Sequence, residues 1–354
     1  YNEYKSDIKF KFIFINRDIF PCINSSKNYD SNISKHAKNM IEHTEWIRNM
    51  KRKLPENSYI DVHYRNIDIE KLSKFLPFGN IKPIFDKLYK QSNEKISSSD
   101  LKIMNSVFND NSIFDIIIPV GPNDVNIIEK QIKYTRKNVI GYRNIYLISY
   151  DPNLIVEGCK TINENIFPFT KKTVFKIHGD TRRNGWYLQQ LLKYYAGNII
   201  PNILKRYLVI DSDTFFLKPT KFILDNKCLY NFGTELNQPY FEHMKKLHKM
   251  FTKVDSKKSG ICHHMIFENK YFNEIINIVE REHKDKFYNI FLKKVTFNDR
   301  HSNGASEYEL YFNYMLKNHK NKIKIRKLNW KDVEVFKGDA NFDYVSYHWH
   351  SRKE

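Results

Sequence analysis

Two aspartates that are separated by one residue follow an apolar segment in the middle of the chain. Residues 207–210 are apolar, and Asp211, Ser212 and Asp213 come directly after them. In an extended backbone, residues i and i+2 point to the same side, so the two carboxylates can converge on one point. Two like charges held together are costly unless a cation or hydrogen-bond donors neutralise them. The pattern favours a site for Mn²⁺ or Mg²⁺ whose coordination a nucleotide diphosphate completes. The alternative is an ordinary turn, which Asp-Ser-Asp also forms well.

A second group of polar side chains is expected on a helix over residues 185–196. Four of its residues share one face because they are spaced i, i+3, i+4 and i+7: Trp186, Gln189, Gln190 and Lys193. The amides could bond ligand hydroxyls, and Lys193, or Arg182 just before the helix, could approach a phosphate. A solvated face with Trp186 as a lone core anchor explains this segment equally well.

The elements that position these residues alternate between strand and helix from residue 114 onward. Strands are expected over three short apolar segments, 114–120, 144–149 and 206–210, and a helix over 124–137. This alternation predicts an α/β fold with a mostly parallel sheet covered by helices. Ligands of such sheets bind beyond the C-terminal ends of the strands, where the paired aspartates stand.

The first part of the chain lacks this alternation. Residues 1–110 are expected to form a mainly helical accessory region, and residues 111–354 the α/β domain. A basic helix is predicted over 36–53, and helical pieces over 71–88 are broken at two prolines. The Ser-rich segment at 97–100 fits either a linker or a helix cap.

Composition narrows the classes of protein. Hydrophobic residues make up 41% of the 354 residues, with 26 Phe and 23 Tyr, which excludes a disordered chain. The formal net charge of +19 attracts phosphates, nucleic acid and acidic surfaces alike. An AT-rich coding sequence gives the same abundance of Lys, Asn, Ile, Tyr and Phe, so charge alone decides nothing.

The cysteines and the apolar segments indicate the cellular compartment in which the protein is expected. No apolar run approaches the ~18 residues of a membrane span, so none is expected in this chain. The four cysteines are isolated in the sequence: Cys22, Cys159, Cys228 and Cys262. They indicate neither a disulfide scaffold nor a zinc ribbon, and a reducing, cytoplasmic location is expected. The chain begins at Tyr1, which leaves an upstream targeting segment open.

Two segments together resemble a known class of enzymes. Residues 180–193 and 207–219 are similar to segments of the GT-A class of nucleotide-sugar-dependent glycosyltransferases. They are closest to a family of glycosyltransferase-like proteins found in bacteria and in large DNA viruses. The similarity extends from about residue 114 to the C-terminus, including 260–265 and 306–311, and does not cover residues 1–110.

The resemblance implies a Rossmann-like nucleotide-binding fold and a donor that is a nucleotide-sugar, usually UDP-linked. Asp211 and Asp213 would bind the metal that bridges the donor diphosphate, with Asp213 the direct ligand. The donor site is then expected to include further residues: Pro119, Val120, Asp124, Asp180, Arg182, Trp186, Gln189, Gln190, Lys193 and Ser212. The expected acceptor is a hydroxyl of a glycan or a protein, and viral relatives suggest, by analogy, capsid glycans or collagen-like proteins.

The resemblance also implies roles for two histidines. In GT-A enzymes a late histidine often completes the metal coordination, and His348 is chosen here over His350, which fits an exposed position at a terminal strand. Only neutral imidazole binds a metal, so metal affinity should fall as the pH drops through the histidine range. His264 is assigned to the acceptor region. A polar corner beside a buried strand over 265–267 is the alternative.

Two glutamates can be separated by their position at a helix start. Ser306 and Glu309 have the spacing of a capping box, so Glu309 is expected to bond backbone donors. Glu307 then lies in the first turn, where the helix dipole keeps a carboxylate ionised. Glu307 is therefore the candidate base that deprotonates an acceptor hydroxyl in an inverting transfer, a role that an acidic residue has in many inverting GT-A enzymes.

Proteins of other classes fit part of the sequence. A nucleic-acid-binding protein or metal nuclease is compatible with the charge, the aromatic residues and the paired acids, and would bind with steep salt dependence. No recognised nucleic-acid-binding signature is present, so nucleic acid is not an expected partner. A non-catalytic sugar-binding module is a further alternative. The basic residues 322–326 alternate with isoleucines, which is typical of a protected edge strand.

Overall fold

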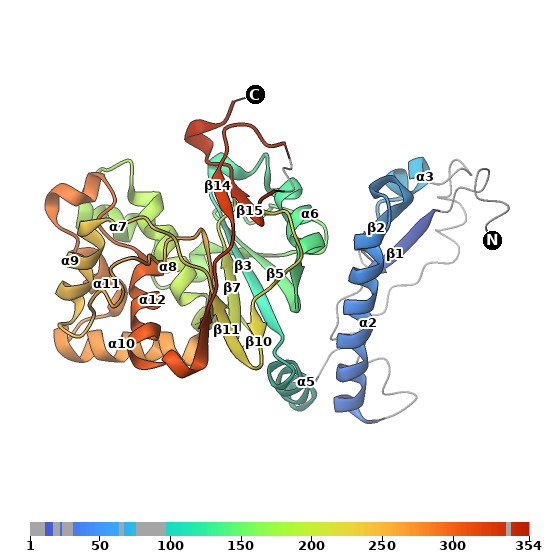
Figure 1. Ribbon diagram of the computed structural model, residues 1–354, viewed down its shortest axis with the longest axis horizontal. Helices are drawn as coiled ribbons and strands as arrows, with labels where there is room; N and C mark the ends of the chain where they lie inside the picture. Colours follow the sequence, from blue (N-terminus) through green and yellow to red (C-terminus); the bar gives the residue numbers. More distant parts are fainter. Residues whose placement is uncertain are drawn as a thin grey trace. The chain divides into compact units, whose positions relative to one another are not determined.

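The fold is described from a computed structural model of the chain. The described residues are 11–16, 22, 31–63, 67–75, 97–337 and 341–353. They divide into two compact units, Tyr1–Asn111 and Ser112–Glu354 (Figure 1). Each unit is described by itself.

The N-terminal unit combines helices with a small parallel sheet. Its strands are β1 (Phe12–Asn16) and β2 (Tyr59–His63), and its helices are α2 (Ile33–Lys53), α3 (Ile69–Phe75) and α5 (Ser98–Asp110). The predicted basic helix is present but begins earlier, because the Asn32 side chain accepts a hydrogen bond from the Lys35 amide and starts it at Ile33. The predicted helical pieces beyond residue 75 lie outside the described residues.

A serine decides where the last helix of this unit begins. The Ser97 hydroxyl accepts a hydrogen bond from the Asp100 amide at 3.2 Å, which makes Ser97 the N-cap of α5. Of the two interpretations that the sequence left open, the helix cap is the one found. The two parallel strands β1 and β2 are an addition to the mainly helical region that was predicted.

The C-terminal unit is built around a five-stranded, mostly parallel sheet, as the sequence predicts. The strand order is β12-β7-β3-β5-β6. The strands are β3 (Phe114–Val120), β5 (Tyr142–Ser149), β6 (Lys160–Asn163), β7 (Arg206–Ile210) and β12 (His264–Glu268). Only β12 is antiparallel, and it pairs with β7. All seven residues of β3 are buried, as expected for a strand covered on both faces.

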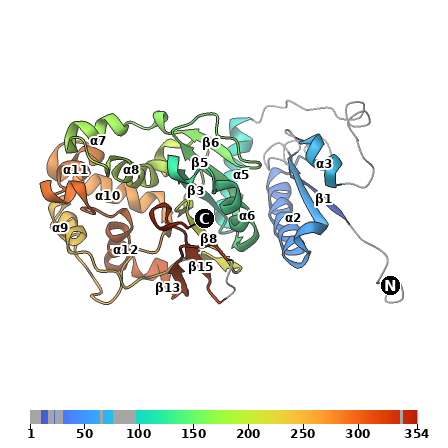
Figure 2. The same ribbon diagram turned by 90° about the horizontal axis from the view of Figure 1, so that it is seen from above.

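Helices cover both sides of this sheet. They are α6 (Ile128–Asn138), α7 (Lys171–His178), α8 (Asn184–Ile199), α9 (Gln238–Leu247), α10 (Asn269–His283), α11 (Phe287–Lys293) and α12 (Glu307–Asn318). In Figures 1 and 2, α8 and α10 lie on one side of β3 and α6 lies on the other. The first helix starts later than predicted, because Pro122–Asp124 form a separate 3₁₀ turn.

Small sheets complete the unit. One has the order β10-β11-β13, another β14-β15-β8, and a pair is formed by β4 and β9. Their bounds are β4 (Val139–Ile140), β8 (Thr214–Phe216), β9 (Thr220–Lys221), β10 (Ile223–Leu224), β11 (Lys227–Tyr230), β13 (Ile323–Ile325), β14 (Trp330–Asp332) and β15 (Tyr344–Ser346). The predicted strand in the basic segment is β13, and it lies at the edge of its sheet.

The helix α8 runs past the glycine at which it was predicted to end. A Cβ atom added to Gly197 would lie 2.6 Å from Cε1 of Tyr207 and 2.8 Å from Oδ1 of Asn269. Glycine is therefore needed here for the close approach of α8 to β7 and to the start of α10. The helix ends at Ile199, and Ile200, which precedes a proline, is extended.

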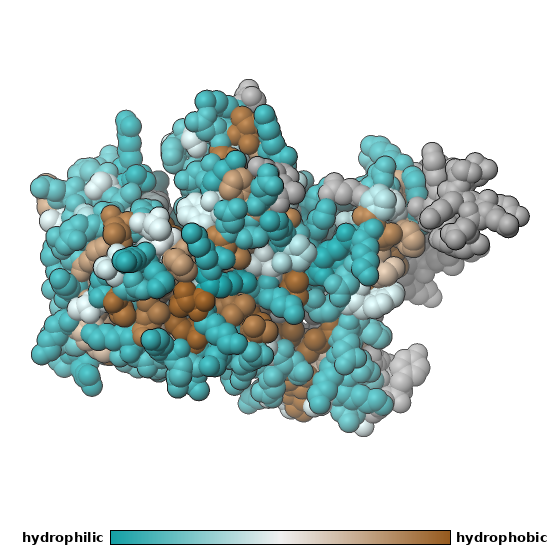
Figure 3. Space-filling view, viewed as in Figure 1, coloured by the Kyte–Doolittle hydropathy of each residue, from teal (hydrophilic) through white to brown (hydrophobic). Residues whose placement is uncertain are grey.

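Apolar side chains are exposed at several places on the surface of the described residues. The face drawn in Figure 3 is largely hydrophilic, with apolar residues in smaller patches. Among the most exposed large apolar side chains are Ile155, Phe297 and Trp349, and isolated side chains of this kind are usual on protein surfaces. No helix within the described ranges is long and apolar enough to cross a membrane.

Two buried histidines bind the C-terminal end of α11 and give the fold a pH dependence. His243 Nε2 is 2.8 Å from the carbonyl oxygen of Phe291, and His178 Nε2 is 2.9 Å from that of Leu292. Burial lowers the pKa of both, and that of His243 to about 4. Between the unfolded value of about 6.5 and this lower value, the unfolded chain binds a proton that the folded chain excludes, so stability falls as the pH falls.

We expect His243→Gln to weaken this pH dependence. The glutamine amide can still donate to the carbonyl but does not titrate. Between pH 7 and pH 5 the wild type should lose about 2 kcal/mol more free energy of unfolding than the variant. Urea unfolding at both pH values measures the difference, with the exposed His350→Gln as control. If wild type and His243→Gln lost the same free energy of unfolding between pH 7 and pH 5, His243 would not be the source of the pH dependence.

Candidate active site

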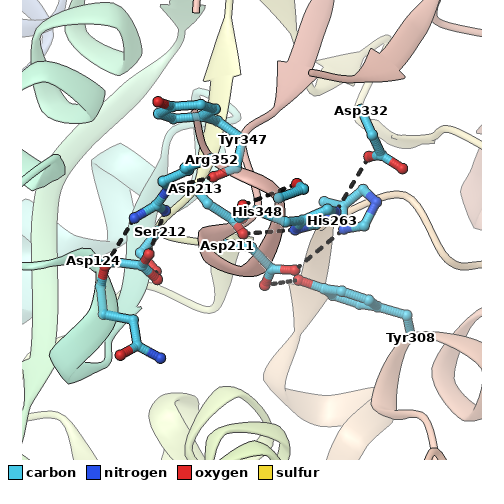
Figure 4. Close-up of polar contacts among 12 residues, drawn as sticks. Asp124, Asp211, Ser212, Asp213, His263, Tyr308, Asp332, Tyr347, His348 and Arg352 are labelled. Carbon is cyan, nitrogen blue, oxygen red and sulfur yellow. Dashed lines mark hydrogen bonds and ion pairs between the residues drawn. The ribbon is translucent and has the colours of Figure 1, made fainter. Parts of the chain in front are cut away.

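The candidate site lies at the C-terminal ends of the two central strands, β3 and β7. The chain passes from β3 to β5 on one side and later returns to β7 on the other, so the strand order reverses between β3 and β7. In open α/β sheets, ligands bind in the crevice at such a point. Asp124 follows β3 and Asp211 follows β7, and the Ser212 hydroxyl donates to Asp124 Oδ2 at 2.6 Å (Figure 4). The two strand ends are thus linked directly.

Asp213 is held against the C-terminal part of the chain. The strand β8 begins one residue after Asp213 and pairs with β15, and the Tyr347 amide donates to the Asp213 carbonyl at 2.8 Å. This pairing brings His348 Nδ1 to 2.7 Å from Asp213 Oδ2. The structure therefore brings together Asp213 and the histidine that was chosen from the sequence, and it leaves His350 exposed.

His348 lies between two carboxylates. Its Nδ1 contacts Asp213, and its Nε2 is 3.2 Å from Oδ1 of Asp332, at the end of β14 (Figure 4). Burial alone would lower the pKa of His348, but the hydrogen bonds to both carboxylates outweigh it and raise the pKa to about 10. Without a bound metal, the ring is therefore a cation that neutralises part of the negative charge here.

A buried lysine joins Asp211 to α12. Lys193 Nζ is 2.6 Å from Asp211 Oδ1 and 2.6 Å from Glu307 Oε1, and the Tyr308 hydroxyl donates to Asp211 Oδ1 at 2.9 Å. Burial alone would lower the pKa of Lys193, but the two carboxylates outweigh it and hold the pKa above its usual value. Burial likewise opposes ionisation of Asp211, yet Lys193 and His263 keep its pKa well below the usual range. Asp211 is thus a carboxylate at neutral pH, paired with the Lys193 ammonium group.

The structure places Glu307 in the interior. The residue begins α12 as predicted, but it is only 4% exposed and its carboxylate is paired with Lys193. Burial raises the pKa of Glu307, and the charge of Lys193 partly opposes this. A carboxylate enclosed in this way does not face an acceptor hydroxyl. Its position fits a residue that holds Lys193 beside Asp211, and the role of base stays a prediction.

The predicted capping box forms only in one direction. The Ser306 hydroxyl accepts a hydrogen bond from the Glu309 amide at 3.2 Å. The Glu309 carboxylate does not return this bond to the Ser306 amide. It accepts from the Gly260 amide at 3.1 Å and from Asn313 Nδ2 at 2.7 Å. Glu309 is therefore structural, as expected, but it ties α12 to the segment before β12.

Part of the predicted helix face reaches the site. Lys193 does so through its ion pairs, and Gln190 Oε1 accepts a hydrogen bond from the Glu307 amide at 3.1 Å. Gln190 therefore positions the start of α12. The sequence had predicted that its amide would contact a ligand hydroxyl. Trp186 is half-buried against the ring of Tyr187, with ring centroids 4.9 Å apart.

Other predicted donor-site residues lie further from the aspartates. Asp180 and Arg182 are exposed before α8, and Gln189 is half-buried on it. Among the described residues, these three form no hydrogen bond or ion pair with Asp211 or Asp213. Pro119 and Val120 are buried at the end of β3, where their side chains pack inward.

The neighbouring histidines near β12 have opposite surroundings. His264, the residue chosen from the sequence, is buried and packs against Phe216, Phe222 and Tyr344. Burial lowers the pKa of His264 to about 3, and neither of its ring nitrogens has a hydrogen-bond partner among the described residues. This aromatic surrounding does not support an acceptor-binding role. His263 points toward the site instead, with Nδ1 3.7 Å from Asp211 Oδ2.

The backbone at His263 is held in an unusual conformation. Its φ is +59°, in the left-handed region that non-glycine residues seldom adopt. The Asp211 amide donates to the His263 carbonyl at 2.9 Å, so this conformation is fixed next to the first aspartate. Strained residues of this kind cluster at functional sites. The adjacent pair of histidines was the only sequence signal, and it did not show which of the two would face the site.

The end of the chain contributes two more residues that were not predicted. Asp332 contacts His348, and Arg352 contacts Asp124 with Nη2 2.5 Å from Oδ1. Arg352 Nη1 also donates to the Asn123 carbonyl at 2.8 Å. Burial raises the pKa of Asp124, although the hydrogen bonds from Ser212 and Arg352 oppose it. A guanidinium ion therefore lies at the end of β3, beside Asp124, which was predicted to belong to the donor site.

We call five of these residues the carboxylate–histidine cluster: Asp211, Asp213, His263, Asp332 and His348. They come from the ends of β7 and β14, from the residue before β12, and from the segment after β15. Three carboxylates and two imidazoles converge here at the C-terminal end of the sheet (Figure 4). The arrangement is suited to holding a divalent cation.

The fold and the site define an α/β protein with a polar, cation-suited site where the sheet order reverses. Residues 101–349 match the model of DUF6492, a family of unknown function, and the chain belongs to this family. No curated protein matches the sequence. The family match includes every residue of the carboxylate–histidine cluster.

Proposed function

We propose that the protein is a metal-dependent glycosyltransferase of the GT-A class. It would move a sugar from a nucleotide-sugar donor, UDP-linked, to a hydroxyl of a glycan or protein acceptor. The observation that carries this proposal is the pair Asp211 and Asp213 at the end of β7, next to the end of β3 and in contact with His348. That is the position at which a parallel sheet binds nucleotides.

The residues present fit a divalent cation. Oδ1 of Asp213 is buried and has no hydrogen-bond partner among the described residues. A buried carboxylate oxygen without a partner is costly, and a water molecule bound to the ion or a ligand hydroxyl would remove that cost. The ion would lie within the carboxylate–histidine cluster, whose oxygen and imidazole donors suit Mn²⁺. When bound, it would neutralise the negative charge on the departing nucleoside diphosphate.

The protein's own cations have distinct tasks in this proposal. Lys193 is neutralised by Asp211 and Glu307, so it fixes the orientation of Asp211 and does not bind phosphate itself. Arg352 lies at the end of β3, where among the described residues it pairs with Asp124 alone and donates to the Asn123 carbonyl. A guanidinium donates in a planar fork that matches phosphate oxygens, so Arg352 is the residue placed to bind the diphosphate.

Thermal unfolding with ligands tests the proposal. We expect UDP or a UDP-sugar to stabilise the protein in the presence of Mn²⁺, by about 2.7 kcal/mol at a hundredfold excess over the dissociation constant. This corresponds to a rise of a few degrees in the midpoint for a domain of this size. Without Mn²⁺ the rise should disappear, and His348→Ala should abolish it while His350→Ala preserves it.

The same assay also tests other donors and other classes of ligand. GDP and its sugars distinguish the base of the donor, and single-stranded and double-stranded oligonucleotides test the nucleic-acid class. Stabilisation by oligonucleotides alone would contradict the proposal, as would nucleotide binding that is indifferent to the metal. Release of UDP from a UDP-sugar, measured with and without acceptor glycans, then tests turnover itself.

A further inference from the structure

Three members of the carboxylate–histidine cluster approach one another as metal ligands do. One ligand atom from each of His263, Asp332 and His348 lies within 4.8 Å of the others. The Nε2 atom of His348 and Oδ1 of Asp332 are 3.2 Å apart. Two ligands on one ion, each at about 2.1 Å from it, are roughly 3.0 Å apart in octahedral and 3.4 Å apart in tetrahedral geometry. These two atoms could therefore share an ion without moving.

The third residue requires only a small movement. Ligands opposite each other on an octahedral ion are separated by roughly 4.2 Å. The ring nitrogen of His263 lies within 4.8 Å of the other two ligand atoms. It can be opposite only one of them and must be about 3.0 Å from the other, so a movement of at most about 1.8 Å, shared between the side chains, closes the set. The ring centroids of His263 and His348 are 4.9 Å apart, which leaves room for an ion beside both.

Rigid neighbours hold these three residues in place. Trp330 stacks on Tyr344 with an interplanar angle of 8°, and the His263 ring packs edge-on against Trp330. Asp332 pairs in register with Ser346 of β15, two residues before His348. Because strands and stacked rings position the three side chains, the set is preorganised, as a metal site requires.

Each of the two aspartates after β7 lies near the Nδ1 atom of one imidazole. Asp213 Oδ2 accepts from Nδ1 of His348, which leaves Nε2 as the nitrogen directed at Asp332. Asp211 Oδ2 is 3.7 Å from Nδ1 of His263. A carboxylate behind a histidine is the usual support of a metal-ligating imidazole, because it fixes the tautomer and the orientation of the ring.

We propose that His263, Asp332 and His348 ligate a first-row transition-metal ion directly, and that Asp211 and Asp213 are positioning residues that orient the two imidazoles. This differs from the sequence-based expectation that Asp213 is the direct ligand. Two imidazoles favour Mn²⁺ and its heavier neighbours over Mg²⁺, which prefers oxygen ligands. That the ion serves sugar transfer rests on the proposed function, whereas the binding of the ion does not.

Binding of Mn²⁺ alone tests this assignment. Titration followed by electron paramagnetic resonance gives the affinity, and electron spin-echo modulation shows whether imidazole nitrogens are bound to the ion. We expect the modulation of two nitrogens in the wild type and of one in His263→Asn, a variant that tolerates the left-handed backbone. Asp332→Asn and His348→Ala should weaken binding at least 100-fold. Mg²⁺ should compete only at a much higher concentration than Mn²⁺.

A variant of Asp213 shows whether this residue ligates the ion or only positions His348. Asp213→Asn should weaken Mn²⁺ binding by roughly 10- to 100-fold and keep both nitrogen signals. Matched controls are Glu334→Gln, an exposed acid two residues after Asp332, and His350→Ala; both should bind as the wild type does. Circular dichroism and melting curves show that each variant is folded.

The outcomes are distinct. Loss of binding in Asp213→Asn with normal binding in Asp332→Asn would overturn the assignment and place the ion on the aspartate pair. Absence of any nitrogen signal in the wild type would also overturn it. If Mn²⁺ binds with two nitrogens but no nucleotide-sugar stabilises the protein, the metal site stands and the proposed glycosyltransferase function fails.

Discussion

Replacing His348 with alanine should reduce metal-dependent sugar transfer by roughly 10³-fold, or about 4 kcal/mol of transition-state stabilisation. This single ring contacts both Asp213 and Asp332, so its removal separates the two halves of the carboxylate–histidine cluster. It also leaves the half-buried carboxylate of Asp213 and the exposed carboxylate of Asp332 without the group that lies between them. Release of UDP from the donor at saturating Mn²⁺ measures the loss.

A matched control lies two residues further along the chain. The ring of His350 stacks on that of His348 at 5.6 Å, but His350 is exposed. His350→Ala should keep activity within about twofold of the wild type, as expected for the substitution of an exposed side chain outside the carboxylate–histidine cluster. Added imidazole should restore part of the activity of His348→Ala and none to a variant that is unfolded. Near-normal turnover in His348→Ala would remove His348 from the site.

The strands that carry the site were predictable because they lie in the centre of a parallel sheet. Most residues in β3 and β7 are apolar and buried, so each strand is a mostly apolar segment that is followed by polar residues. Both were predicted with the bounds that the structure shows. Since parallel strands end at the same edge, the approach of Asp124 to the Asp211 region follows from the sequence alone.

The other half of the cluster could not be predicted in this way. The strand β14 has three residues, too few for a periodic pattern, so nothing in the sequence marks Asp332. His263 reaches Asp211 because β12 pairs with β7 in the antiparallel direction, and that pairing is a tertiary contact. His263 and His264 are adjacent in the sequence, and the left-handed backbone at His263 decides which of them faces the site.

The role of Glu307 shows a different limit. Its position at the start of α12 was predicted correctly from the spacing of Ser306 and Glu309. The sequence argument treated the helix dipole as the main influence on its charge. The structure shows a stronger one, since Lys193 of α8 makes an ion pair with it in the core. Such a partner, distant in sequence, cannot be identified without the packing of α8 against α12.

This ion pair leads to the largest expected effect on stability. Lys193→Met should lower the free energy of unfolding by about 3 to 5 kcal/mol, because removing one partner leaves uncompensated charge in the interior. Here the loss affects Asp211 and Glu307 together, since Lys193 Nζ is 2.6 Å from each. Urea unfolding at pH 7 measures the change. Glu307→Gln combined with Lys193→Met should recover part of it, because one of the two buried charges is then absent.

An exposed lysine with similar geometry provides the comparison. Lys293 Nζ is 2.7 Å from Asp285 Oδ2, but its side chain is 57% exposed, so Lys293→Met should cost no more than about 1 kcal/mol. The two variants should also differ in pH dependence. Without Lys193, the pKa of Glu307 rises further above its unfolded value, so Lys193→Met should regain stability as the pH falls from 7 to 5. Equal losses in the two variants, unchanged by pH, would show that Lys193 carries no buried charge pair and that Asp211 is held in place by other contacts.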